Sequence, residues 1–94
     1  MKKAYLLAFS ETLGTQEQVK AFVEKMTDVT TWRYDLPHAF YLISTVDAKT
    51  LSERLRELAG DKGRFIIAEI TENSSGWLTL ESWHLIQHKQ QKPK

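Results

Sequence analysis

Strand-forming residues recur in four short segments of the chain, and each segment has its own pattern of apolar and polar positions. The first is apolar from Ala4 to Phe9, which predicts a central strand covered on both faces. The second alternates strictly, with Trp32 on one side and Arg33 on the other. Pro37 then interrupts the pattern, so the second and third strands read as a hairpin. The predicted strands cover residues 3–9, 30–36, 39–46 and 64–70.

Three helices are expected between and after these strands. Thr15 opens the first with a capping box, in which the Thr15 and Gln18 side chains satisfy free backbone amides, and the helix should end near residue 27 or 28. Asp47 is a good N-cap for the second helix, with a competing capping box at residues 50–53, and Gly60 sits where a left-handed C-cap belongs. Thr79 caps a short third helix.

The element order is therefore β-α-β-β-α-β-α. Two right-handed βαβ crossovers around a hairpin predict an α+β fold: a ferredoxin-like βαββαβ sandwich with a short additional C-terminal helix. A chain of 94 residues has room for one such domain, which we place at residues 1–88. Residues 89–94 are expected to form a flexible basic tail.

Both faces of the predicted sheet are apolar, because both registers of the first, third and fourth strands carry apolar side chains. Two helices can cover only one face, and a bare second face would exceed what a monomer usually exposes. The cover is a second subunit, a C-terminal segment with Trp77, Leu80 and Trp83, or a ligand such as a nucleic-acid base. We favour a homodimer, with or without that segment. The expected interface residues are Tyr5, Leu7, Phe9, Tyr41 and Ile43.

Charge separates the tail from the rest of the chain. The formal net charge is +1, but three of the 13 basic residues lie in residues 89–94, which contain no acid. The remainder has 10 basic and 12 acidic residues, unlike a strongly basic nucleic-acid binder. Any nucleic-acid binding would need a local patch, and Trp32 with Arg33 is the candidate because an aromatic and a cationic side chain stand together. Packing in the core or in a dimer is the competing interpretation of the same aromatic residues.

The chain contains no cysteine, which excludes disulfides and cysteine-ligated metal sites and fits a reducing, cytoplasmic location. The apolar run after Lys2 and Lys3 is too short for a signal peptide and lacks a cleavage site, so we interpret it as a strand. No stretch approaches the roughly 18 apolar residues of a membrane span. We therefore predict no membrane association.

Segments along nearly the whole chain carry a resemblance to a known family. They are Tyr5-Leu6-Leu7, Trp32-Arg33, residues 40–45, residues 51–58, residues 64–70, and Gly76-Trp77-Leu78 with Trp83. A chain with these segments in this order resembles small bacterial SinR-like proteins, which are related in fold to VapD and to the small CRISPR-associated ribonuclease of the spacer-integration complex. In those proteins the sheet commonly packs against a second copy. The resemblance therefore implies a homodimer and a setting linked to mobile elements or defence.

The sequence departs from those relatives where their chemistry would sit. The CRISPR-associated proteins carry an aspartate at the end of the first strand, proposed as a metal ligand. Here that stretch reads Ala8-Phe9-Ser10, and no carboxylate precedes Glu11. A scaffold that lacks the acid argues against a metal-dependent nuclease.

Two other groupings are candidate chemical sites. His84 and His88 stand at i and i+4, a spacing that can bind a metal, but no third ligand is evident and a solvated helix end explains them. Ser10, Glu11 and His38 could meet at one sheet edge, but no nucleophile-elbow context surrounds Ser10. We therefore predict no catalytic residue, no metal and no cofactor.

The function that follows is a small non-catalytic interaction module that forms a homodimer. The alternative is a nucleic-acid-binding protein or a metal-dependent ribonuclease of the same fold. The sequence identifies neither a ligand nor a pathway.

Overall fold

The computed structural model describes residues 1–93 and contains four strands and three helices within that range. The elements run in the order β1 (Lys3–Phe9), α1 (Gln16–Lys25), β2 (Val29–Arg33), β3 (Ala39–Ser44), α2 (Ala48–Ala59), β4 (Phe65–Ile70) and α3 (Leu80–His88). The predicted α+β class is confirmed, and the βαββαβ order fits a ferredoxin-like arrangement.

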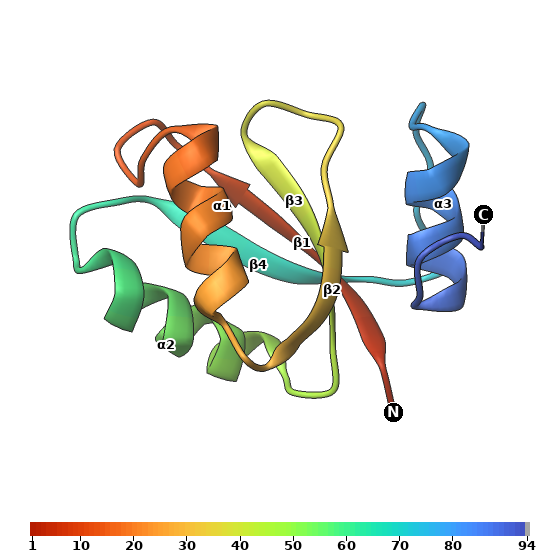
Figure 1. The fold of residues 1–94 in the computed structure, drawn as a ribbon, viewed down its shortest axis with the longest axis horizontal. Helices are drawn as coiled ribbons and strands as arrows, with labels where there is room; N and C mark the ends of the chain where they lie inside the picture. Colours follow the sequence, from red (N-terminus) through yellow and green to blue (C-terminus); the bar gives the residue numbers. More distant parts are fainter. Residues whose placement is uncertain (94) are drawn as a thin grey trace.

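The four strands form one antiparallel sheet in the spatial order β2-β3-β1-β4. β1 and β3 are therefore central, and β2 and β4 are the edges. α1 and α2 lie over one face of the sheet, whereas α3 lies on the opposite side (Figure 1). This arrangement gives the domain two separate apolar clusters, one on each face.

The larger cluster lies between the sheet and the two longer helices. α1 starts as predicted, because the Thr15 side chain accepts a bond from the Gln18 backbone N–H and the Gln18 side chain accepts one from the Thr15 N–H. α2 starts at the predicted Asp47 cap and ends at Gly60, whose positive φ of 79° is one that glycine adopts without strain, although its ψ of −173° is not that of the left-handed cap predicted. The buried side chains here include Tyr5, Leu7, Phe9, Phe40, Leu42 and Leu55.

The smaller cluster lies between the sheet and α3. Leu85 and Ile86 of α3 pack against Ala4, Tyr41 and Ile43, all of which are buried. The helix begins at the predicted cap, where the Thr79 hydroxyl accepts a bond from the Ser82 N–H. α3 is thus a genuine cover for part of the second face.

Several predicted ends lie one to three residues beyond the observed ones. β2 ends at Arg33, and β3 ends at Ser44. Pro37 follows β2 closely and lacks a donor, which explains why ladder pairing stops early. α1 ends at Lys25, because the cap residue Met26 is already extended, with a ψ of 96°.

The tail prediction can be followed only in part. Lys89 adopts the left-handed conformation that ends α3, and the Gln91 side chain donates to the Thr31 hydroxyl and to the Trp32 carbonyl. The predicted tail, residues 89–94, ends at Lys94, which lies outside the described residues.

Candidate interaction surface

α3 covers the part of the second face that is made by β2, β3 and the start of β1. Beyond it, the same face continues over two cross-strand pairs, Leu6 with Ala68 and Ala8 with Ile66. Leu6 and Ala8 are half-buried, Ala68 is exposed, and the Ile66 side chain is 64% exposed on the edge strand β4. We call these four residues the open half of the sheet.

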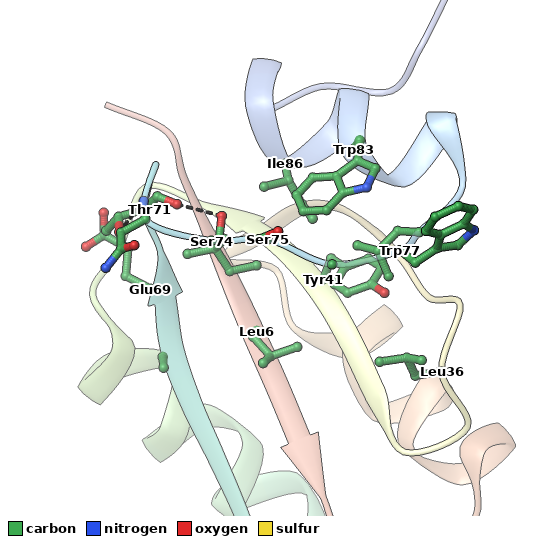
Figure 2. A pocket seen from close by; sticks show the side chains of 15 residues that line it. Leu6, Leu36, Tyr41, Glu69, Thr71, Ser74, Ser75, Trp77, Trp83 and Ile86 are labelled. Carbon is green, nitrogen blue, oxygen red and sulfur yellow. Dashed lines mark hydrogen bonds between the residues drawn. The ribbon is translucent and has the colours of Figure 1, made fainter.

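A pocket of about 470 Å³ adjoins the open half. Its floor includes Leu6, Tyr41 and Ile70 from the strands, and Trp83 and Ile86 of α3 line one side. The segment that joins β4 to α3, residues 71–79, crosses over the sheet and completes the lining (Figure 2). The volume of the pocket lies within the usual range for small-molecule pockets, and a large side chain also fits into a pocket of that size.

The rim of this pocket carries the most exposed aromatic side chain in the described part of the chain. Trp77 is 99% exposed, although indole is among the largest apolar groups that a protein can bury. Leu36, which also lines the pocket, is 47% exposed. Exposed apolar groups gathered around one hollow are typical of an interaction site.

The pocket is close to electrically neutral. Among the described residues that line it, Glu69 alone carries a charge. Glu69 pairs with Tyr5, whose side chain faces α1 and α2, so the Glu69 side chain leaves the strand on that opposite face. Burial, followed by the charge of Glu69, raises the pKa of the Tyr5 hydroxyl, which agrees with this placement.

Tyr41 is the polar side chain of the pocket floor. It is buried, and its hydroxyl makes no hydrogen bond of standard distance and angle within residues 1–93. Burial, then the charge of the nearby Asp35 carboxylate, and then a hydrogen-bonding interaction with that carboxylate raise the pKa of Tyr41 to about 12. The hydroxyl therefore stays protonated at physiological pH and offers hydrogen-bonding capacity without charge.

A small polar network fixes α3 beside the pocket. The Arg33 Nε donates to the Ser82 hydroxyl at 3.2 Å, and the Thr79 hydroxyl donates to the Asp35 carboxylate at 3.2 Å. Ser82 is fully buried between the helix and the sheet. These bonds hold the N-terminal turn of α3, and hence the pocket wall, against the end of β2.

The five residues predicted as an interface do not share a face. Tyr5, Leu7 and Phe9 are buried under α1 and α2, in the large cluster. Tyr41 and Ile43 lie on the other face and are buried under α3. The prediction that these five residues form one interface is wrong. The alternation along β1 and β3 separates the two faces of each strand, but it does not show which face packs against α1 and α2.

Trp77 and Leu80 also differ from the expected C-terminal cover. Of the three residues predicted to cover the sheet, only Trp83 packs against the α3 cluster. Leu85 and Ile86 contribute instead, since they and Ser82 occupy the helix face that meets the sheet. Leu80 lies on the far side of the helix, and Trp77 precedes it on the crossing segment.

The two residues predicted to bind nucleic acid are directed to opposite faces. Trp32 pairs with Leu42 and packs with Tyr34 and Phe40 on the α1 and α2 side, its ring 6.1 Å from that of Tyr34. Arg33 faces α3 and bonds to Ser82. Both residues nevertheless line one hollow at the β2 edge, and the Lys20 ammonium lies 6.0 Å from the centroid of the Trp32 ring, so nucleic-acid binding here stays a prediction.

The other sequence candidates are brought together only in part. His38 does lie beside the end of β1, with its ring 5.6 Å from Phe9. The Ser10 hydroxyl bonds to Thr12 and to the Arg64 carbonyl, and no bond joins it to His38 among the described residues. The rings of His84 and His88 lie 4.4 Å apart, but no group of three metal-ligating side chains forms within residues 1–93.

Sequence reasoning did not single out Ile66 and Ala68. One usable signal was side-chain size, because β1 carries its bulky residues in one register and Ala4 and Ala8 in the other. The bulky register packs under the two long helices, which leaves the small register on the α3 side.

No helix within the described range is long and apolar enough to span a membrane.

No protein-family model matches the chain, and neither a curated protein nor a solved structure matches it.

Proposed function

We propose that this chain is a non-catalytic interaction module of ferredoxin-like fold that assembles as a homodimer through the open half of its sheet. The observation that carries the proposal is the exposed apolar surface that α3 leaves uncovered, with Ile66 at its edge and Trp77 at the pocket rim. The resemblance to SinR-like proteins, whose sheets commonly pack against a second copy, supports the same assembly.

The neutral pocket favours a second copy over a charged partner, and the cation Arg64 lines a separate hollow with Ala8 and Ile66 at the other end of the open half. In a two-fold dimer each residue near the axis meets its own equivalent, so like charges there would repel. The described lining of the pocket carries no lysine or arginine, and the side chain of Glu69 leaves on the other face. Nucleic acid, by contrast, is held chiefly by cations that neutralise phosphates.

The expected affinity follows from apolar area. Burying several hundred Å² per subunit contributes on the order of 10 kcal/mol, at roughly 25 cal/mol per Å². Loss of translational and rotational freedom opposes part of that gain. A pair with a dissociation constant in the micromolar range is therefore expected, and a protein concentration of about 50 μM should populate it.

Sedimentation equilibrium on wild type and two charge variants tests the proposal. Ile66→Glu places a charge on the open half and should give a folded monomer. Leu58→Glu is the matched control, because Leu58 is a partly exposed leucine of α2 on the other face, and it should remain dimeric. Circular dichroism checks that both variants fold. A monomeric wild type at about 50 μM would refute the dimer, and a dimeric Ile66→Glu would refute its location.

A further inference from the structure

The Trp77 side chain and the pocket beside it have complementary properties. Trp77 is almost fully exposed and makes little contact with its own chain. The pocket is lined by apolar groups, with Trp83 on the α3 side and Leu6 on the strand side (Figure 2). An exposed indole and an open apolar pocket on one face are the two halves of an anchor contact.

Both features lie on the same face and close together, since Trp77 is itself part of the pocket lining. A two-fold axis near the rim would bring each Trp77 over the pocket of the other copy. An isologous interface requires this kind of reciprocity, in which residue i meets residue j and residue j meets residue i. No residue of this chain within the described range fills the pocket from the outside.

We infer that Trp77 is the anchor of the homodimer and that it inserts into the pocket formed by Leu6, Tyr41, Trp83 and Ile86 of the second copy. This inference rests on the proposed homodimer and names the contact that holds it. The neutral lining fits the insertion of an uncharged indole.

Three substitutions separate this anchor from general loss of apolar surface. Trp77→Ala removes the indole from a fully exposed position, so the monomer should fold normally and dimerise at least about 30-fold more weakly. Trp77→Phe keeps an aromatic ring and should lose less affinity. Leu80→Ala is the control, because Leu80 is a large exposed side chain close in sequence to Trp77 but on the outer side of α3; its affinity should stay within about twofold of wild type.

Intrinsic fluorescence supplies a second readout. As wild-type protein is concentrated through its dimerisation range, the emission of exposed Trp77 should move to shorter wavelength, because the indole leaves water. In Trp77→Phe the shift should be smaller, because Trp32 lies on the other face and only Trp83, in the pocket wall, is then covered by the second copy.

The outcomes distinguish the two proposals. A wild type that stays monomeric would refute the homodimer, and the anchor with it. A wild type that dimerises, together with a Trp77→Ala variant of unchanged affinity and no concentration-dependent shift, would refute the anchor while the homodimer stands. A Trp77 shift that appears only when an unrelated protein is added would assign the pocket to a different partner and would also refute the anchor.

Discussion

The two faces of the sheet are made from the same strands, yet they are covered to different depths. On one face α1 and α2 enclose a large cluster with Tyr5 and Leu7 at its centre. On the other, the single short helix α3 encloses a smaller cluster and leaves Ile66 and the pocket open. Strand alternation therefore determines which side chains share a face of the sheet. The number and length of the helices packed on that face determine how much of it is exposed to solvent.

A matched pair of leucines gives the largest expected contrast. Leu7 and Leu85 are both fully buried, but Leu7 lies in the two-helix cluster and Leu85 lies on α3. Leu7→Ala should lower the free energy of unfolding by roughly 4 kcal/mol and Leu85→Ala by roughly 2 kcal/mol. The smaller loss is expected because α3 is joined through an exposed segment and can move to fill the cavity. Urea unfolding of both variants checks this, and equal losses would show that α3 is as rigidly packed as the other helices.

Much of the fold could be predicted because local signals agreed with one another. The capping box at Thr15, the cap at Asp47 and the glycine at position 60 mark helix ends through backbone hydrogen bonding, which depends on a few neighbouring residues. β1 was bounded correctly at Lys3–Phe9 for a similar reason, since its apolar run is continuous. The predicted ends of β2 and β3 differ from the observed ones, because pairing at a strand end depends on the partner strand.

The candidate surface was harder to predict, because it depends on long-range packing. The sequence indicated that the second face needed a cover, and α3 does cover part of it. Which register meets the long helices depends on how the side chains of three strands fit together, so Tyr5, Leu7 and Phe9 were assigned to the wrong face. The exposure of Trp77 depends on the path of the crossing segment, for which an amphipathic pattern gives no signal.

Alkaline pH should weaken the domain through its two buried tyrosines. The pKa of Tyr41 is raised to about 12 by burial and by Asp35, while an unfolded tyrosine titrates near pH 10. Below pH 10 both states keep the proton. Between pH 10 and 12 the unfolded chain loses it first, so the free energy of unfolding falls, by about 2 kcal/mol from Tyr41 at pH 12.

Urea unfolding at pH 8, 10 and 11.5 measures this loss. Burial and the charge of Glu69 raise the pKa of Tyr5 as well, so wild type should lose stability through both groups. Tyr41→Phe should retain more of its pH 8 stability than wild type does. A Tyr41→Phe variant with the same alkaline loss as wild type would mean that Tyr41 titrates normally.

The smallest and most specific contrast compares the two tyrosine hydroxyls at neutral pH. On the large-core face, the Tyr5 hydroxyl donates to the Val46 carbonyl at 2.7 Å. On the α3 face, the Tyr41 hydroxyl is buried without a hydrogen bond of standard geometry within residues 1–93. Tyr5→Phe removes a formed hydrogen bond and should cost about 1 kcal/mol, whereas Tyr41→Phe removes a hydroxyl that has only its interaction with Asp35 and no bond of standard geometry, so it should cost less. Because dimerisation adds its own stability, the comparison is made at a concentration well below the dissociation constant. A loss of about 1 kcal/mol in both variants would show that Tyr41 has a bonding partner in solution, and the two faces would then differ in depth of cover but not in polar satisfaction.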